Sequence, residues 1–422
     1  MMHLTGKRIN LITFLGALCM LLSAVEYAIP KPVPFMRLGL ANLPVMLALY
    51  IGLSTPEYFL LVVLKIMTQA LVSGTLFSYV FLFSLAGSFS SAAVMLLFSR
   101  CGHSRVNAAQ AATSVKAGTA DQADLAEKAA SAVQASSAVK ASPADKAQSA
   151  FKANGRAAFS AVGISLAGAL ANNLAQIVLS YFLLFGNSTR YIAPVLLSAG
   201  IVTATVLGVF AEAFMSRSRW FAAVSARQGT DAGNAVPDTS AGKNDSDAEI
   251  FKSGNPAKTD CSTVSLTFRL SAALCLLLVF LFITDIRIKA ALTVIFYIAA
   301  RIRRKKVRIL PSVIILVTVT FASLLSPAGR VLIRLGNFPI TLGALETGLS
   351  RALTLTGMVF LSQYATSLPI KLPGKAGVLL GKVFFWFSLL SARKLTFKKG
   401  SVIKTLDAHL CEIYLSQNAD SE

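Results

Sequence analysis

Apolar runs that are long enough to cross a bilayer alternate with polar loops along most of the chain. Six runs precede residue 217, at about 9–29, 38–53, 57–73, 78–99, 157–185 and 191–215. Five more follow, at about 264–284, 288–300, 309–326, 340–366 and 376–391. Since a helix of roughly 20 apolar residues spans the hydrocarbon core, this pattern predicts an all-α polytopic membrane protein.

Two polar stretches interrupt these runs. Residues 103–154 are rich in Ala, Ser, Lys and Gln and have little apolar surface to bury, which predicts a disordered insertion. Residues 217–262 are rich in Gly, Asp, Ser, Asn and Pro, which predicts a flexible linker. The chain therefore divides into a membrane domain over 1–216 and a second one over 263–422. In the tail beyond Lys394, apolar residues recur at helical spacing, which indicates an amphipathic surface helix.

The charge pattern orients these helices. The formal net charge of the 422 residues is +21, and most basic clusters flank apolar runs, as the positive-inside rule requires, so nucleic acid is not an expected partner. Lys7 and Arg8 place the N-terminus in the cytoplasm, and six crossings return the chain there near Arg217. Both polar stretches then lie in the cytoplasm. We expect a multi-pass protein of a bacterial inner membrane.

Several kinds of chemistry lack their motifs. The five cysteines form no CxxC pair, and no histidine lies at metal-ligand spacing, so we expect neither a metal nor a cofactor. No Asp-rich DDxxD motif is present to hold Mg²⁺ around a diphosphate. No Walker A motif is present either, because Val383 in "GKAGVLLGKV" replaces the required Ser or Thr. We therefore predict no catalytic residues and no ATP hydrolysis by this chain.

Lys65 is the most informative polar residue. It lies in the middle of the apolar run "YFLLVVLKIMTQALVSG" with no acidic residue within four positions. An ammonium ion there is costly, so it should face a protein interior or a water-filled cavity. Gln69, one turn later, shares its helix face. Lys65 either supplies a positive charge to a substrate carboxylate or phosphate, or forms a structural ion pair with Glu26 or Glu212.

A second polar group lies in "ANNLAQ", within another apolar run. Asn172, Asn173 and Gln176 fall within one and a half turns of helix and cannot all point the same way. At least one should therefore bond a neighbouring helix. Asn173 and Gln176 are the candidates for lining a binding site.

Three segments carry a family resemblance. The segments "RLGLANLPVMLALY" (37–50), "SGTLFSYVFLFSLAGS" (73–88) and "VGISLAGALANNLAQ" (162–176) resemble the Gx transporter family, whose members are often labelled heptaprenyl diphosphate synthase component I. That family is similar to the substrate-binding S components of energy-coupling-factor (ECF) transporters, which have six helices. The match covers residues 9–215 apart from 103–154. Ala171 stands where the family tends to have histidine, so no histidine role is expected here.

The C-terminal domain resembles ECF T components, the membrane coupling subunits. The similar stretch is "FPITLGALETGLSRALTLTGMVFLSQ" (338–363), after the basic "RIRRKK". T components usually carry paired Ala-Arg coupling motifs on long cytoplasmic helices. Here "SARK" (391–394) supplies the candidate coupling residues Arg393 and Lys394, with a weaker echo in "AARIRR" (299–304).

The resemblance implies a six-helix S-like bundle followed by a T-like helical domain. In S components the outer loop closes over the substrate, which makes Arg37 and Asn42 candidates for holding a polar or anionic ligand. Alternatively, Arg37 reaches lipid phosphate and Asn42 caps a helix. The implied function is the membrane subunit of an uptake transporter, with ATPase subunits on separate chains. The alternatives are a non-catalytic membrane component associated with polyprenyl diphosphate synthesis and a structural membrane scaffold.

Overall fold

A computed structural model describes residues 6–28, 39–117, 160–233, 263–303, 309–326, 329–335, 338–366, 374–392 and 402–419. This part of the chain is nearly all helical. The N-terminal helices are α1 (Gly6–Ala28), η1 (Leu40–Asn42), α2 (Leu43–Ile51), α3 (Thr55–Ser73), α4 (Tyr79–Ala117), α7 (Ala161–Ser180), η2 (Tyr181–Phe185), η3 (Gly186–Ser188), α8 (Thr189–Arg217) and α9 (Arg219–Gly233). The C-terminal elements are α10 (Thr263–Phe282), α11 (Ile286–Arg303), α12 (Ile309–Leu324), β1 (Val331–Leu335), β2 (Phe338–Thr341), α13 (Leu342–Ala365), α14 (Gly374–Ala392) and α15 (Val402–Ala419).

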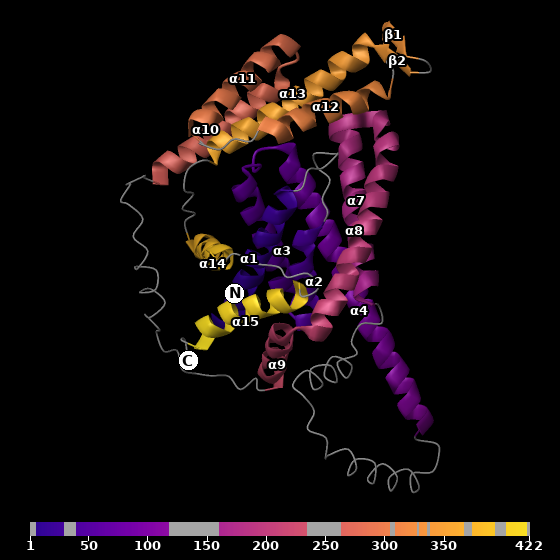
Figure 1. Cartoon of the computed structure of the whole chain (residues 1–422), viewed down its shortest axis with the longest axis vertical. Coiled ribbons are helices and arrows are strands. Elements are labelled where there is room, and N and C mark those ends of the chain that lie inside the picture. Colours follow the sequence, from indigo (N-terminus) through magenta and orange to yellow (C-terminus); the bar gives the residue numbers. More distant parts are fainter. Residues whose placement is uncertain are drawn as a thin grey trace.

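Four apolar stretches of the described chain are long enough to cross a membrane: Arg8–Glu26, Thr55–Ser73, Tyr79–Cys101 and Ala161–Arg217. The last contains both α7 and α8, which run side by side (Figure 1). Valines recur at helical spacing along one exposed face of α8, at Val195, Val202, Val206 and Val209. An exposed apolar face of this extent is typical of a surface that meets lipid. These features indicate a multi-pass membrane protein.

The second predicted crossing is shorter in the structure than the sequence pattern suggested. Its described helical part, Leu40–Ile51, is an apolar helix of fewer than 18 residues. At 1.5 Å per residue it covers roughly 18 Å, which is less than the hydrocarbon core of about 30 Å. The six-crossing count of the N-terminal domain therefore stays a prediction.

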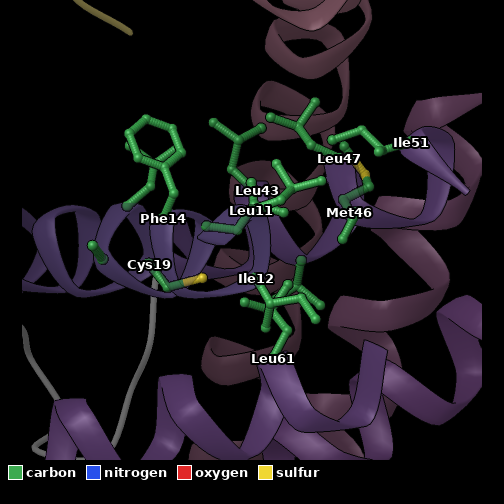
Figure 2. Packing of buried hydrophobic residues seen from close by; sticks show 14 of the residues in the cluster. Leu11, Ile12, Phe14, Cys19, Leu43, Met46, Leu47, Ile51 and Leu61 are labelled. Carbon is green, nitrogen blue, oxygen red and sulfur yellow. The ribbon is translucent and has the colours of Figure 1, made fainter. Parts of the chain in front are cut away.

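The main hydrophobic core is built around α1. Leu11, Ile12 and Phe14 are buried there, and they pack with Leu61 of α3 and with residues of α2 (Figure 2). Unlike a helix with one lipid face, α1 is buried along almost all of its middle, from Leu11 to Met20. It is therefore the central helix of the N-terminal bundle.

Helices α10 to α13 form a second layer, which lies across one end of the N-terminal bundle (Figure 1). The contact involves Leu184 and Phe185 of η2, which cluster with Val319 of α12 and Leu355 of α13. The Phe77 N–H, in the α3–α4 connection, donates to Ser362 Oγ of α13 at 2.9 Å. This layer thus covers the end of the bundle at which α3 meets α4 and α7 meets α8.

Helices α14 and α15 pack against the N-terminal bundle. A Cβ placed on Gly16 of α1 would meet Val383 of α14 at 3.3 Å. Phe14 contacts the rings of Trp220, Trp386 and Tyr414, so α1, α9, α14 and α15 share one aromatic cluster. The predicted helix in the C-terminal tail is confirmed as α15, but its apolar face is buried in protein.

Asp407 fastens α15 to the α8–α9 corner. Its carboxylate accepts hydrogen bonds from Ser218 Oγ and from the backbone N–H groups of Arg219 and Trp220, the last two at 3.0 Å. Ser218 Oγ in turn accepts from the Phe221 N–H at 3.1 Å. These bonds satisfy N–H groups that a helix N-terminus leaves without partners.

Three further expectations from the sequence differ from the structure. The chain is not strictly all-α, because β1 and β2 form an antiparallel pair with Leu335 opposite Phe338. The two residues between them, Gly336 and Asn337, are a pair that favours a tight hairpin turn. Helix α4 continues to Ala117, into the stretch expected to be disordered, because alanine-rich sequence readily extends an existing helix.

The third difference concerns the expected linker over 217–262. It begins with α9, in which Trp220 is fully buried and Phe221 and Val224 are also buried. Burial of their apolar surface offsets the conformational entropy that is lost when this segment is ordered against the bundle. Residues 234–262 lie outside the described part of the chain.

Candidate functional site

Lys65 lies at the meeting point of three helices. Its side chain is 3% exposed in the middle of α3. Its ammonium donates hydrogen bonds to Asn42 Oδ1, at the start of α2, and to Ser88 Oγ of α4, the latter at 3.5 Å. Both acceptors are neutral, and an ammonium ion bonds more strongly to a negatively charged oxygen. The geometry therefore suits an anionic or strongly polar ligand group.

Local backbone geometry presents Asn42 to Lys65. Gly39 adopts a left-handed conformation (φ 85°), which favours glycine, and its carbonyl accepts the Asn42 N–H at 2.8 Å. Asn42 occupies the N-cap position of α2, but its side chain makes no capping hydrogen bond. The amide oxygen bonds Lys65 instead, which argues against the purely structural interpretation of Asn42 as a helix cap.

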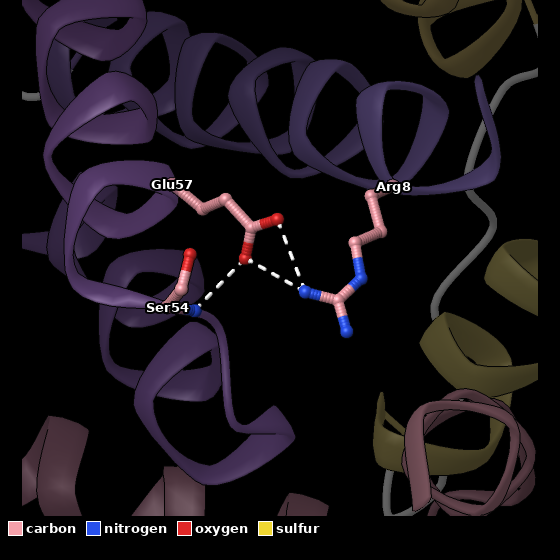
Figure 3. Close-up of polar contacts among 3 residues, drawn as sticks. All are labelled: Arg8, Ser54 and Glu57. Atoms are coloured by element: carbon pink, nitrogen blue, oxygen red, sulfur yellow. Dashed lines mark hydrogen bonds and ion pairs between the residues drawn. The ribbon is translucent and has the colours of Figure 1, made fainter. Parts of the chain in front are cut away.

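Helix α3 is fixed at its start by its own acidic residue. Glu57 Oε2 accepts the Ser54 N–H at 2.8 Å, in a capping box. Arg8 Nη1 of α1 donates to both carboxylate oxygens of Glu57, at 3.2 and 3.4 Å (Figure 3). Glu57 is thus already paired, and it precedes Lys65 by about two turns of helix, or roughly 12 Å.

The two acidic residues considered as structural partners of Lys65 differ in environment. Glu26 near the end of α1 is buried, whereas Glu212 on α8 is exposed. A buried carboxylate is the better candidate for a structural pair, because burial strengthens the attraction between charges. Glu26 therefore stands as the structural alternative that an experiment on Lys65 must separate from ligand binding.

The amide side chains of α7 form a chain of hydrogen bonds. Gln176 Nε2 donates to Asn172 Oδ1 at 3.2 Å, and Asn172 Nδ2 donates to Asn173 Oδ1 at 3.4 Å. Asn173 Nδ2 donates to the Leu196 carbonyl of α8 at 3.0 Å. The prediction that at least one of these residues bonds a neighbouring helix is confirmed, and that residue is Asn173.

Glycines on the flanking helices make room for these amides. A Cβ on Gly87 of α4 would lie 2.2 Å from Asn172 Oδ1, and one on Gly200 of α8 would lie 1.8 Å from Asn173 Nδ2. Since real Cβ atoms do not approach so closely, any larger residue at either position would force the amide beside it to move. Asn172 and Gln176 thus face α4, whereas Asn173 faces α8.

Several buried oxygens between α4 and α7 lack hydrogen-bond partners among the described residues. They are Gln176 Oε1, on a side chain that is fully buried, and the hydroxyl oxygens of Ser84 and Ser91 on α4. Native proteins rarely leave such groups unpaired, so each is a place where a ligand or water can bond. Unpaired polar groups therefore flank Gly87 on both sides along α4.

The structure brings some of the predicted site residues together. Asn42 contacts Lys65 directly. Lys65 and the pair Asn172 and Gln176 meet consecutive residues of α4, at Ser88 and Gly87 respectively. Gln69 is half-buried one turn after Lys65 on α3. A single cavity shared by Lys65, Asn42, Asn173 and Gln176 stays a prediction. Arg37, Arg393 and Lys394 lie outside the described residues.

Sequence reasoning missed the α4 side of the site. Ser84, Gly87, Ser88 and Ser91 recur three or four residues apart in an otherwise apolar helix, so they share one face. This stripe of small and polar residues was the available signal. It is also typical of simple helix packing, and only the contacts with Lys65 and Gln176 distinguish the two.

Two family models match different parts of the chain. Residues 15–122 and 134–214 match the family model described as heptaprenyl diphosphate synthase component I. Residues 265–367 match a domain of unknown function, DUF8519. No curated protein and no solved structure matches the chain.

Proposed function

We propose that the N-terminal part of this membrane protein forms the substrate-binding part of an uptake transporter. Residues 15–122 and 134–214 of this part match the family model described as heptaprenyl diphosphate synthase component I. The transporter is of the energy-coupling-factor type. A small polar or anionic solute enters from outside and binds in the N-terminal bundle. The observation that carries this proposal is the buried Lys65 ammonium, bonded to the neutral oxygens of Asn42 and Ser88.

Binding at this site follows from the donors and acceptors present. An anionic oxygen of the solute bonds the Lys65 ammonium in preference to the neutral acceptors. The unpaired oxygens of Gln176, Ser84 and Ser91 accept or share protons with the remaining polar groups of the solute. Glycine at Gly87 keeps the α4 backbone close to α7, so these groups converge.

Energy for transport comes from ATPase subunits on other chains, since this sequence has no Walker A motif. Arg393 and Lys394, followed by α15, belong to the surface on which such subunits dock. Helix α15 suits this role because its apolar face is held by Leu410, Ile413 and Tyr414 inside the protein. Movement of a docked partner would therefore pass directly to α1 and α9.

The test of ligand binding is a Lys65→Met variant of the full chain. This change removes the charge at nearly constant length, so we expect bound solute to be lost while membrane insertion is unchanged or improved. The measurement is mass spectrometry of small molecules released from the purified protein. Lys382→Met is the matched control, because Lys382 Nζ of α14 also bonds a neutral oxygen, Asn10 Oδ1, at 3.4 Å.

The opposite outcome identifies a structural role for Lys65. If Lys65→Met lowers the unfolding temperature and leaves bound solute intact, Lys65 belongs to a structural ion pair, with Glu26 as the first partner to examine. The coupling half of the proposal is tested separately, by co-purification of ATPase chains with the wild type and with Arg393→Glu. Loss of those chains in the variant only is the expected result.

A second candidate function rests on the family description itself, which names heptaprenyl diphosphate synthesis. In that role the chain is a non-catalytic membrane component that binds a prenyl synthase or its lipid product. It lacks the Asp-rich motif of a catalytic subunit. Co-purification distinguishes the two functions: a prenyl synthase in place of an ATPase supports this one.

A further inference from the structure

A second buried lysine lies in the C-terminal layer, apart from Lys65. Lys289, in the first turn of α11, is 8% exposed, and its Nζ donates to Ser350 Oγ of α13 at 3.2 Å. Among the described residues this hydroxyl is its only hydrogen-bond partner, and no carboxylate oxygen lies within 4 Å of it. An ammonium ion has three protons to donate, and burying it without a negative charge is strongly unfavourable.

The acidic residues nearest in sequence to Lys289 and Ser350 do not neutralise the buried charge of Lys289. Asp285 precedes Lys289 by one turn, and its exposed carboxylate accepts the Arg287 N–H at 2.9 Å, as a cap of α11. Glu346 precedes Ser350 by one turn of α13 and is also exposed. Solvated carboxylates compensate a buried cation poorly, since water screens them. A ligand that carries its own negative charge would do so directly.

The packing of α11 on α13 is closed on one side of Lys289. Thr293, one turn further along α11, donates to the Lys289 carbonyl at 2.8 Å and lies 3.4 Å from the Leu353 carbonyl. A Cβ on Gly357 would lie 3.0 Å from Thr293 Oγ1 and clash with Phe280 at 2.5 Å. No room for a ligand is left in that direction. In the other direction along α11, Thr284 and Asp285 of the α10–α11 connection are exposed.

A second cation follows the Lys289 partner in the sequence of α13. Arg351 directly follows Ser350 on α13, is half-buried, and has no carboxylate within 4 Å among the residues that the structure describes. An ammonium in contact with a hydroxyl, with a guanidinium one residue further along α13, is a donor set that suits a tetrahedral oxyanion, because each group can bond a different oxygen. The donor set therefore favours a phosphate group over a single carboxylate.

The surface next to Lys289 is apolar. Ile288, Ile295 and Ile302 recur every seven residues on α11, and each is exposed. Phe282, at the end of α10, is 81% exposed. Acyl chains can lie along such a face while a headgroup stays at the polar end of the helix.

We propose that Lys289, Ser350 and Arg351 bind a phosphate group between α11 and α13, supplied by an anionic phospholipid whose acyl chains lie along the exposed isoleucines of α11. Free phosphate has the same chemistry for the donors but leaves the apolar face uncovered. The site is independent of the proposed solute site at Lys65, and its test does not depend on transport.

The test titrates the purified full-length chain, in a detergent with an uncharged headgroup, with three probes. Phosphatidylglycerol carries the phosphate and the chains, diacylglycerol carries the chains alone, and inorganic phosphate has no chains. Native mass spectrometry measures the bound fraction. We expect saturable binding of phosphatidylglycerol and a loss of roughly tenfold or more in affinity for Lys289→Met, the range for one charge-assisted contact.

Three matched variants separate loss of the phosphate contact from the general effects of removing a charge or unfolding the protein. Lys382→Met removes a lysine with a neutral partner from α14 and should bind phosphatidylglycerol like the wild type. Ser350→Ala keeps both charges and should weaken binding less than Lys289→Met does, which keeps the test open if Lys289→Met fails to fold. Glu346→Gln should leave binding unchanged.

The outcomes separate the possibilities. Saturable binding of inorganic phosphate that depends on Lys289 supports the site with free phosphate as its ligand. Equal affinity of the wild type and Lys289→Met for both phosphate probes overturns the proposal. The proposal is also overturned if Glu346→Gln and Lys289→Met both strongly destabilise the protein. Lys289 would then be held by Glu346 rather than by a ligand.

Discussion

At the scale of single residues, the candidate site depends on close approaches that only glycine permits. The Asn173 amide reaches the Leu196 carbonyl because Gly200 leaves space beside it, and Asn172 lies against Gly87 in the same way. Burying an amide side chain costs desolvation free energy unless its polar atoms form hydrogen bonds. The two glycines are therefore part of the polar network, although they contribute no polar side chain.

Gly200→Ala tests this dependence. The new Cβ would lie 1.8 Å from Asn173 Nδ2, so the amide must move and lose its bond to Leu196. We expect a cost of about 1–3 kcal/mol, measured as a lower unfolding temperature of the purified chain. Gly16→Ala is the control, because its Cβ would meet only apolar atoms, the nearest being a Val383 methyl group at 3.3 Å and Leu64 Cβ at 3.8 Å. Equal unfolding temperatures for the two variants would contradict the placement of Asn173.

A double variant sharpens the result. Gly200→Ala combined with Asn173→Ala removes both the added crowding and the amide that suffers from it. The two changes should therefore cost less together than the sum of their separate costs, as expected for residues in contact. Strict additivity would show that Gly200 and Asn173 do not touch.

At the scale of elements, α9 and α15 stabilise one another. Neither is long or apolar enough to be a strong helix on its own in water, and helices of this size depend on packing. Asp407 of α15 supplies the cap for α9, and Trp220 of α9 lies in the aromatic cluster with Tyr414 of α15. The burial of Cys411 raises the pKa of its thiol, with a further rise from the nearby Asp407 carboxylate. Leu410, Ile413 and Tyr414 of α15 are buried, so this segment is packed as protein interior.

Asp407→Ala should release α9. The change leaves the N–H groups of Arg219 and Trp220 without their acceptor, which costs about 1–3 kcal/mol for buried groups. We expect faster cleavage within α9 in limited proteolysis. Lys404→Gln, on the same helix but exposed, should be cleaved at the wild-type rate. The cap assignment is wrong if both variants behave alike.

At the scale of the whole molecule, the two ends of the N-terminal bundle have different covers. Helices α10 to α13 lie over the end formed by the α3–α4 connection and the α7–α8 turn, whereas α9 and α15 lie towards the other end (Figure 1). The charge pattern of the sequence predicts that the second end faces the cytoplasm. On that orientation, solute from outside must pass the layer of α10 to α13 to reach Lys65.

Labelling with an impermeant thiol reagent on intact cells tests this orientation. In a chain without native cysteines, Ala130→Cys and Ser240→Cys should remain unlabelled, because an even number of predicted crossings precedes each. Asn187→Cys, in the exposed α7–α8 turn, should be labelled and serves as the positive control. Labelling at either of the first two sites would refute the six-crossing count.

The sequence by itself determined where the main helices lie and that Lys65 must be buried despite the unfavourable free energy of placing a charge there. Apolar runs of membrane-spanning length predicted the positions of α1, α3, α4, α7 and α8, because each helix must present apolar surface to lipid or to its neighbours. The Ser54, Glu57 and Gly74 signals fix the ends of α3. Burial of Lys65 followed from its place in an apolar run. All of these depend on neighbours within a few positions.

Only the tertiary structure decided which distant groups meet. The contact of Lys65 with Ser88 joins residues 23 positions apart, and that of Asp407 with Ser218 joins residues 189 positions apart. The sequence also did not show that α14 and α15 pack directly on α1 and α9, because α10 to α13 lie between these helices along the chain. A local pattern specifies which face of a helix is apolar or polar, but not which partner covers it. That choice depends on the simultaneous packing of all the helices.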